Sequence, residues 1–342
     1  MKVPVFAVDV GFGNTKSAFR MGSDIATKMY PSLTPPARKK KVTGDGHGVL
    51  ESRNLVNVVV EGIEYEVGPG VSISSANGDA GRTLHDDFCL TSNYAALLAG
   101  SLYLAGVSEV DRLVLGLPVE RMQYATAVRD TYTGTFDFGH GPVKINSVKV
   151  IPQPLGALVA FSAYGGGNGE TFDRENAHLI IDVGYFTTDW VVANGFTMED
   201  GRSGGQNGGA SKIYREIADK IAAQYESSCD GVERIDKCLR ENKPFLYYQR
   251  EIDVKQYLRQ CEPVIAATVK AIETSAGRGD DLRSIVLTGG GAALYEHAIR
   301  ERFDETPVVV LEAACFANVK GFLIVGESTL ARERKAPLGV AA

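Results

Sequence analysis

The chain of 342 residues carries 36 Lys and Arg against 42 Asp and Glu, which gives a formal net charge of −6. This mildly acidic composition suits a globular protein of two domains and lacks the broad positive field that sequence-independent DNA or RNA binding requires. No apolar run approaches the roughly 18 residues that span a bilayer, and five cysteines without a Cys-x-x-Cys pair argue against a disulfide framework, so we expect a cytoplasmic protein.

The first half of the chain alternates short apolar strands with helices. Val3–Val10 is a β-branched run that stops at Gly11, and Thr15–Arg20 is its expected hairpin partner. Residues 31–54 are rich in Pro, Gly and basic side chains, and we expect a long exposed loop there. The other expected elements of this half are strands at 57–62, 64–68, 112–117, 133–138 and 143–151, and helices at 91–105, from 118, and at 153–163.

The second half begins after the glycine-rich stretch 165–169 with an apolar strand, His178–Ile181. Its other expected elements are strands at 189–193, 196–202, 284–287 and 307–311, and helices at 210–225, 230–241, 251–275 and 292–302. This alternation predicts an α/β fold with one domain over 1–152 and another over 153–312. We expect the C-terminal helix, 313–330, to pack back on the first domain, and residues 331–342 to form a disordered tail.

The two halves open with the same pattern. In each, a strand runs into an aspartate, a glycine turn follows, and a threonine starts the returning strand: Val8–Thr15 in the first half and Ile181–Thr188 in the second. Asp9 and Asp182 are about one domain length apart, which is far longer than a solenoid repeat. The pattern therefore indicates two homologous α/β halves.

The first turn, Asp9–Lys16, has the composition of an anion-binding turn. Glycine lets the backbone approach a phosphate closely, and successive N–H groups in such a turn form a nest for anions. Lys16 could reach a phosphate oxygen, and Asp9 could hold Mg²⁺ through water, since Mg²⁺ dehydrates reluctantly. An ordinary β-hairpin with a surface lysine is the alternative. The candidate phosphate contacts are Gly11, Gly13, Asn14, Thr15 and Lys16.

Two further glycine turns lie in the second half. In Asp182–Asp189 a buried strand ends in a carboxylate, which is costly without a partner; a metal or its water shell would be one, and a plain turn-forming Asp is the alternative. In Thr288–Ala292 three glycines between a strand and a helix would let a ribose or a flat ring pack on the backbone, or would serve a simple turn. The candidate residues are Gly184, Thr187 and Thr188 in the second turn, and Gly289, Gly290, Gly291 and Ala292 in the third.

Neither a P-loop signature nor a Gly-x-Gly-x-x-Gly in a strand–turn–helix context is present. The three turns, in their order and spacing, instead resemble the two phosphate loops and the adenosine loop of the actin/Hsp70/sugar-kinase superfamily. The segments Pro152–Leu158 and Ala314–Gly326 are similar to its two connecting segments. The compact length and the second turn look most like the plasmid-segregation (ParM/StbA-type) and archaeal actin-like ATPases.

This resemblance implies an actin-like fold, with two ribonuclease-H-like α/β domains flanking a nucleotide cleft. It implies ATP/ADP and Mg²⁺ as ligands, ATP hydrolysis coupled to self-association into filaments, and plasmid DNA segregation through a DNA-binding adaptor protein, so that any DNA contact is indirect. Asp9 and Asp182 would position Mg²⁺ through water. Gln153 would orient the attacking water, because an amide aligns water but does not readily remove its proton.

Two positions depart from the pattern of many relatives. Tyr185-Phe186 stands where they carry Gly-Gly or Gly-Thr, so that the donors of the second loop would have to be Thr187 and Thr188. Gln153 stands where some plasmid relatives have Glu, which excludes a strong general base.

A glycine pair also opens the helix expected at 210–225. The N–H groups of Gly208 and Gly209 could face a ribose or a phosphate. Lys212 and Glu216, four residues apart on one helix face, could border the adenine, or could form an ordinary surface ion pair. The run Arg38–Lys41 could touch DNA, an adaptor or a neighbouring subunit, with a solvated loop face as the alternative.

Two other functions remain open from the sequence. The same fold could serve a small-metabolite kinase, although no aspartate outside the proposed Mg²⁺ ligands is a convincing base. It could also serve a scaffold that binds nucleotide without hydrolysing it, if Tyr185-Phe186 blocks the terminal phosphate.

Overall fold

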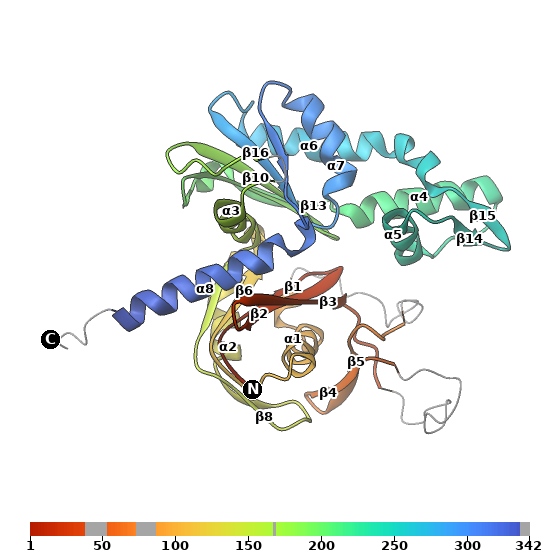
Figure 1. The fold of residues 1–342 in the computed structure, drawn as a ribbon. Coiled ribbons are helices and arrows are strands. Elements are labelled where there is room, and N and C mark those ends of the chain that lie inside the picture. Colours follow the sequence, from red (N-terminus) through yellow and green to blue (C-terminus); the bar gives the residue numbers. More distant parts are fainter. Residues whose placement is uncertain (38–52, 73–86, 167–168, 336–342) are drawn as a thin grey trace. The chain divides into compact units, whose positions relative to one another are not determined.

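The computed structural model describes residues 1–37, 53–72, 87–166 and 169–335. The chain divides into two compact units (Figure 1). The first consists of Met1–Leu117, Arg121–Ala160 and the segment from Phe316 onwards, and the second of Pro118–Glu120 and Phe161–Cys315.

In the described part of the first unit, a seven-stranded sheet runs in the order β3-β2-β1-β6-β8-β7, and β9 also pairs with β6. β1 and β2 form an antiparallel hairpin, whereas β1 and β6 are parallel. The strands are β1 (Lys2–Val10), β2 (Asn14–Met21), β3 (Asp24–Pro31), β6 (Glu109–Leu117), β7 (Gly134–Asp137), β8 (Pro142–Ile145) and β9 (Val148–Pro152). A separate hairpin joins β4 (Val56–Val60) to β5 (Ile63–Val67).

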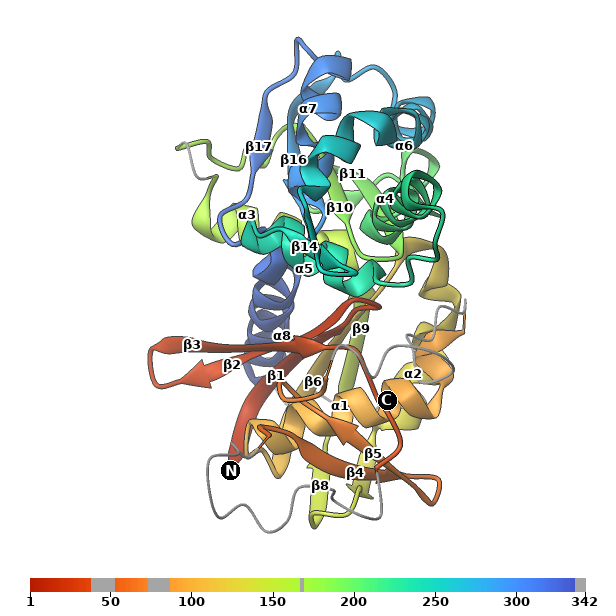
Figure 2. The ribbon, with the colours of Figure 1, turned by 90° about the vertical axis from the view of Figure 1, so that its right-hand side faces the viewer.

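Helices cover both faces of this sheet, as Figures 1 and 2 show for α1 and α8. The alternation of strand side chains explains the arrangement: Phe6 and Val8 belong to the core beneath α1, and Val5 and Ala7 to the core beneath α8. The helices of this unit are α1 (Ser92–Leu104), α2 (Ala125–Tyr132), α8 (Ala317–Lys335) and the first turns of α3 (Gln153–Tyr164), with a short 3-10 helix at Phe88–Leu90. A second 3-10 helix, Val119–Tyr124, begins in the second unit and continues in the first from Arg121.

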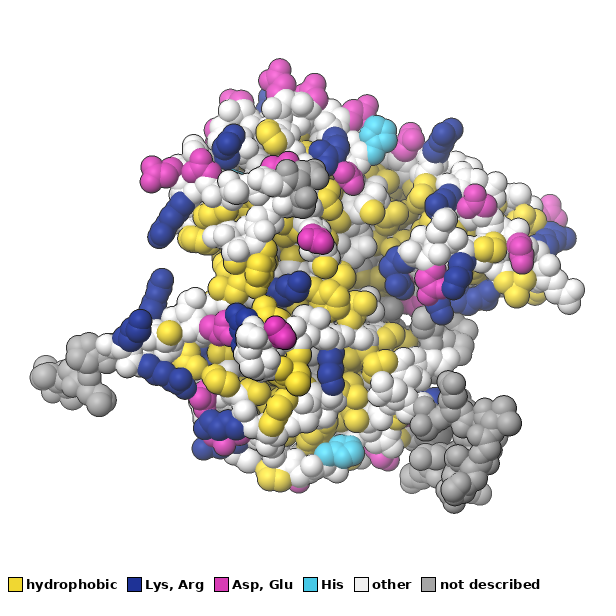
Figure 3. Space-filling view, in the orientation of Figure 1, with side chains coloured by type: hydrophobic (Ala, Val, Ile, Leu, Met, Phe, Trp, Pro, Cys, Tyr) yellow, Lys and Arg dark blue, Asp and Glu magenta, His cyan; other side chains and the backbone are white. Residues whose placement is uncertain are grey.

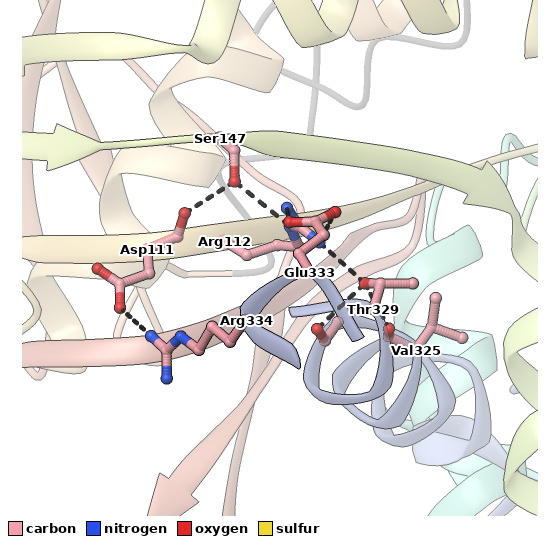
Figure 4. A network of polar contacts seen from close by, with 8 residues as sticks. Asp111, Arg112, Ser147, Val325, Thr329, Glu333 and Arg334 are labelled. Atoms are coloured by element: carbon pink, nitrogen blue, oxygen red, sulfur yellow. Dashed lines mark hydrogen bonds and ion pairs between the residues drawn. The ribbon is translucent and has the colours of Figure 1, made fainter. Parts of the chain in front are cut away.

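The last turns of α8 are attached to β6 by a polar network (Figure 4). Arg112 donates to both carboxylate oxygens of Glu333, at 3.0 and 2.6 Å, and to Thr329 Oγ1 at 3.0 Å. The neighbouring pair has the opposite polarity, since Arg334 donates to Asp111 at 2.9 Å. Two adjacent residues of β6 therefore recognise two adjacent residues of α8.

The second unit repeats the central topology. Its described residues form a six-stranded sheet in the order β12-β11-β10-β16-β17, with β13 also paired to β11. β10 forms an antiparallel hairpin with β11 and pairs in parallel with β16, just as β1 pairs with β2 and β6. The strands are β10 (Ala177–Val183), β11 (Thr187–Asn194), β12 (Thr197–Met198), β13 (Gly204–Asn207), β16 (Leu282–Thr288) and β17 (Val308–Val310).

An apolar core, with Leu179, Ile181, Ile213 and Ile285 among its members, joins this sheet to the helices of the unit. These helices are α4 (Ala210–Tyr225), α5 (Val232–Glu241), α6 (Glu262–Ala276) and α7 (Ala292–Arg302), and a small hairpin of β14 (Phe245–Tyr247) and β15 (Arg250–Ile252) follows α5. Positive and negative side chains are interspersed over the face drawn in Figure 3, in keeping with the small net charge.

The α/β class and most of the expected elements are confirmed, including the helices 210–225 and 292–302 to the residue. The strand expected at 143–151 is two strands, β8 and β9, and the one expected at 196–202 is reduced to β12. Residues 331–335, expected in a disordered tail, continue α8 because the Figure 4 network holds its end. The run Arg38–Lys41 and residues 336–342 lie outside the described residues.

The boundary between the two units falls within α3, between Ala160 and Phe161. The sequence places the domain boundary at 152/153. The first turns of α3 remain with the first unit because Gly156 packs directly against Gly321 of α8. Among the described residues, no helix has both the length and the apolar character needed to cross a membrane.

Candidate functional site

The first glycine turn brings three of the predicted site residues together. Asp9 is the last residue but one of β1, is 2% exposed, and lies opposite Lys16 in the register of the hairpin. Its Oδ2 accepts a hydrogen bond from Lys16 Nζ at 3.0 Å, and its Oδ1 accepts one from Gln153 Nε2 at 2.8 Å. One carboxylate therefore orients both the cation and the amide that the sequence assigned to the phosphates and the attacking water.

Ser32, which follows β3, holds the backbone of this turn through hydrogen bonds. Its hydroxyl donates to the Gly11 carbonyl at 2.5 Å, and its N–H donates to the Gly13 carbonyl at 3.1 Å. Thr15 is fully buried and its hydroxyl bonds to Ser32 Oγ at 2.9 Å, so its side chain braces the loop. Ser32 could not be predicted from the sequence, because it lies among prolines in a segment that was expected to be loop. Asn14 begins β2 and is partly exposed.

In the second unit, the second and third glycine turns pack on each other. Asp182 lies on β10, is 6% exposed, and is in register with Thr288 on β16. Gly289 has φ +90°, and a Cβ there would collide with Asp182 Oδ1 and with the Val183 carbonyl oxygen. The N–H of Gly291 donates to that same carbonyl at 2.9 Å. Only glycine at position 289 allows this approach of the third turn to the second.

The other residues of these two turns differ in exposure. The N–H of Gly184 donates to the Thr187 carbonyl at 2.9 Å and closes the second turn. Gly290 is exposed, and a Cβ on it would meet nothing within 4 Å, whereas Ala292 is buried at the start of α7. Gly290 thus marks the part of the third turn that is open to a ligand.

The first N–H groups of α4 are already used within the protein. Gly208 and Gly209 both donate to the Phe186 carbonyl, at 3.1 and 3.0 Å, and Ala210 donates to the Gly184 carbonyl at 3.0 Å. The expectation that the N–H groups of Gly208 and Gly209 face a ribose or a phosphate is therefore wrong. These bonds instead fasten the second turn to the helix.

The side chains at the start of α4 also differ from the expectation. Glu216 forms its ion pair with Lys220, at 3.0 Å, and not with Lys212, which is exposed. Thr188 is fully buried, and its hydroxyl donates to the Gly208 carbonyl at 3.2 Å, so this hydroxyl is already used within the second unit. Of the two threonines, Thr187 is the more exposed, at 9%.

The bulky Tyr185 is accommodated by the helices of the second unit. Its hydroxyl donates to Glu233 Oε1 on α5 at 2.8 Å, and its ring centroid lies 6.3 Å from that of Tyr214 on α4. Tyr185 thus anchors the second turn to α5.

Asp189, which the sequence analysis did not assign to the site, is a buried carboxylate on β11. It is 2% exposed and pairs in register with Asp182. Burial raises the pKa of Asp189 to about 7; a hydrogen bond from Thr187 opposes the rise and the negative charge of Asp182 adds to it. A charged residue directly before the apolar run Trp190–Ala193 of this strand was the signal that could have revealed it.

The donor set suits a nucleotide-bound magnesium ion better than a metal held by the protein alone. Among the residues that the structure describes, no group of three or more His, Cys, Asp or Glu side chains could hold a metal ion. Mg²⁺ commonly keeps several waters and binds through one or two carboxylates plus substrate phosphates. Each unit offers one buried carboxylate of this kind near the end of a strand, Asp9 in the first and Asp182 in the second.

Two protein-family models match the chain, and they divide it as the glycine turns do. The N-terminal domain of actin like proteins matches residues 7–156, and the C-terminal domain of the archaeal actin homologue MreB-like proteins matches residues 180–301. The chain belongs to the actin-like superfamily. The first match contains Asp9, Lys16 and Gln153, and the second contains Asp182 and Gly289. No curated protein sequence matches this actin-like chain.

Solved structures support the same fold at low sequence identity. A 15-stranded ParM filament from Clostridium botulinum superposes with a TM-score of 0.73 at 20% identity, covering 96% of this chain and 100% of the other. A non-polymerisable quadruple mutant of pCBH ParM gives 0.74 at 20% identity with the same coverage. The archaeal actin homologue Ta0583 in complex with ADP gives 0.71 at 18% identity, covering 95% and 99%. The predicted actin-like fold is thereby confirmed.

Proposed function

We propose that this actin-like protein binds ATP–Mg²⁺ through the glycine turns of both units, hydrolyses the ATP, and assembles into filaments. The observation that carries the proposal is the repeated strand-end carboxylate: Asp9 on the β1–β2 hairpin and Asp182 on the β10–β11 hairpin occupy equivalent positions in two sheets of the same topology. The ADP complex of the archaeal homologue and the ParM filament support nucleotide binding and assembly.

The contacts of Asp9 assign a role to each residue around it. Lys16 supplies positive charge to the phosphates, and Asp9 fixes the position of its ammonium group. Since Gln153 Nε2 donates to Asp9, the amide oxygen is the atom that would accept a hydrogen bond from the attacking water. Phosphoryl transfer depends mainly on this kind of positioning and charge stabilisation. A bound Mg²⁺ would add neutralisation of the phosphate charge.

The second unit contributes through Asp182, Thr187 and the open backbone at Gly290. Asp182 would hold the water shell of Mg²⁺, and Thr187 would donate to a phosphate oxygen. The third turn would receive the adenosine at Gly290, where the structure leaves space. By the same resemblance, the filament would move plasmid DNA through an adaptor protein in the cytoplasm.

Right-angle light scattering together with phosphate release tests the proposal. With ATP and Mg²⁺, scattering should rise only above a critical protein concentration, and phosphate release should follow it. Lys16→Met should abolish both signals, whereas Lys144→Met, on the exposed side of β8 in the same unit, should leave them unchanged.

Other outcomes identify the competing functions. Nucleotide binding without scattering or phosphate release would identify a non-hydrolysing scaffold. ATP consumption only after addition of a small metabolite would identify a kinase. Either result contradicts the proposed filament-forming ATPase.

A further inference from the structure

The three residues that follow β6 belong to the second unit, although the chain on both sides of them belongs to the first. Pro118–Glu120, here called the strap, belong to the second unit, whereas Leu117 before them and Arg121 after them belong to the first. Val119 begins a 3-10 helix, and its N–H donates to Asp189 Oδ1 at 2.9 Å. A side chain distant in sequence thus caps the first N–H of this helix, as an N-cap residue would.

Two consecutive glycines make room for the strap. A Cβ on Gly205 would lie 2.5 Å from Asp189 Oδ1 and 3.5 Å from the Glu120 Cγ. A Cβ on Gly204 would lie 3.2 Å from the Trp190 ring and 3.6 Å from Glu120 Oε1. Glycine weakens a strand interior, and a pair of them within β13 marks a close approach of another segment. Here that segment is the strap together with the carboxylate that holds it.

The same carboxylate contacts the second glycine turn. Asp189 accepts a hydrogen bond from the side chain of Thr187 and is in register with Asp182. Because Asp189 is 2% exposed, water cannot readily replace either of its partners, and a group buried in this way depends strongly on the bonds it keeps. Thr187 and Val119 are therefore connected through one side chain, that of Asp189.

We propose that Asp189 is a positioning residue that links the strap to the second glycine turn. A phosphate bound by Thr187 then strengthens the hydrogen bond from the Val119 N–H to Asp189. When the Thr187 hydroxyl turns to a phosphate oxygen, the buried Asp189 side chain loses one donor and depends more on the Val119 N–H that remains. The nucleotide half of this inference rests on the proposed function; the anchoring half does not.

Hydrogen exchange of the Val119 amide tests the anchoring half without nucleotide. Asp189→Leu removes the acceptor and should speed exchange about tenfold or more, as expected when a buried hydrogen bond is lost. Asp189→Asn keeps an acceptor oxygen and should stay close to the wild type, and Asp219→Asn, on α4, is the matched control. Equal exchange in the wild type and Asp189→Leu would overturn the anchor.

A second variant covers the case in which Asp189→Leu fails to fold. Val119→Pro removes the donor at the first position of a helix, where proline is tolerated, and leaves Asp189 in place. It should speed exchange of the amides from Glu120 to Tyr124 by a similar factor. Unchanged exchange there would also overturn the anchor.

Addition of ATP–Mg²⁺ tests the link. It should slow exchange of the Val119 amide about threefold or more in the wild type and in Asp189→Asn, as expected for one strengthened hydrogen bond, and not in Asp189→Leu. If nucleotide binds and exchange of this amide is unchanged, the link is wrong while the proposed function stands. If no nucleotide binds, the proposed function fails and the link with it, whereas faster exchange in Asp189→Leu still supports the anchor.

Discussion

Gly321→Ala tests how closely α8 must approach α3 for the site to form. A Cβ on Gly321 would lie 2.5 Å from the carbonyl carbon of Gly156 and nearer still to its oxygen. An unstrained contact needs about 3.5 Å, so the two helices must separate by about 1 Å or more. This separation loosens the core around Phe322 and displaces α3, whose first residue, Gln153, bonds to Asp9.

Two opposing contributions to the free energy of unfolding can be compared. Alanine favours a helix interior over glycine by about 1 kcal/mol, and overpacking with lost core contacts costs about 3 kcal/mol. The net loss of about 2 kcal/mol should lower the midpoint of thermal unfolding by about 4–8 °C for a unit of this size. We expect ATP turnover to fall as well, because Gln153 moves with α3.

Circular dichroism melting and phosphate release measure the two effects. Gly201→Ala is the control, since a Cβ there meets nothing within 4 Å. If Gly321→Ala melted and turned over ATP like the wild type and this control, the close helix crossing would not support the site.

Three further predictions use other contacts. Gln153→Ala should slow phosphate release about tenfold or more and keep ATP binding, measured by nucleotide titration, because it removes an orienting group and no phosphate contact. The folded pKa of Asp189, about 7, lies above its unfolded value of about 3.9, so the folded state binds more protons between these values. The free energy of unfolding should therefore fall as pH rises from about 4 to about 7, by up to about 4 kcal/mol, and urea unfolding of Asp189→Asn should lack this loss. Arg112→Met should lower the free energy of unfolding, measured in urea, by about 2 kcal/mol, because the guanidinium side chain is 11% exposed and forms several hydrogen bonds. Glu333→Gln should have little effect, because that side chain is 61% exposed. Equal losses in the two variants would contradict this interpretation of the network.

The sequence predicted those elements whose pattern is local. α4 and α7 each follow a glycine cluster and begin an apolar periodicity, so their limits could be predicted. β13 was missed because Gly204-Gly205-Gln206-Asn207 contains none of the residues that favour strands, and it exists through pairing with β11. The last turns of α8 were missed because their stability comes from Asp111 and Arg112, more than 200 positions away.

In the candidate site, too, local features could be predicted from the sequence, whereas long-range contacts could not. Residues next to the strand ends, such as Asp9 and Asp182, could be predicted from motif and spacing. The direction of hydrogen bonds could not, since the N–H groups of Gly208 and Gly209 point to the Phe186 carbonyl only once the second turn is folded against α4. Asp189 was not assigned because one of its partners, the Val119 N–H, lies in the strap, 70 positions earlier in the chain.

The central claim is that Asp9 and Asp182 serve one nucleotide-bound Mg²⁺, and a double-mutant cycle of nucleotide affinity tests it most directly. ATP affinity is measured with and without Mg²⁺ for the wild type, Asp9→Asn, Asp182→Asn and the double variant. The account predicts that Mg²⁺ tightens binding in the wild type, that either single substitution removes most of this gain, and that the second adds little, because both carboxylates act on the same ion. Additive losses, or a Mg²⁺ dependence that survives both substitutions, would contradict it.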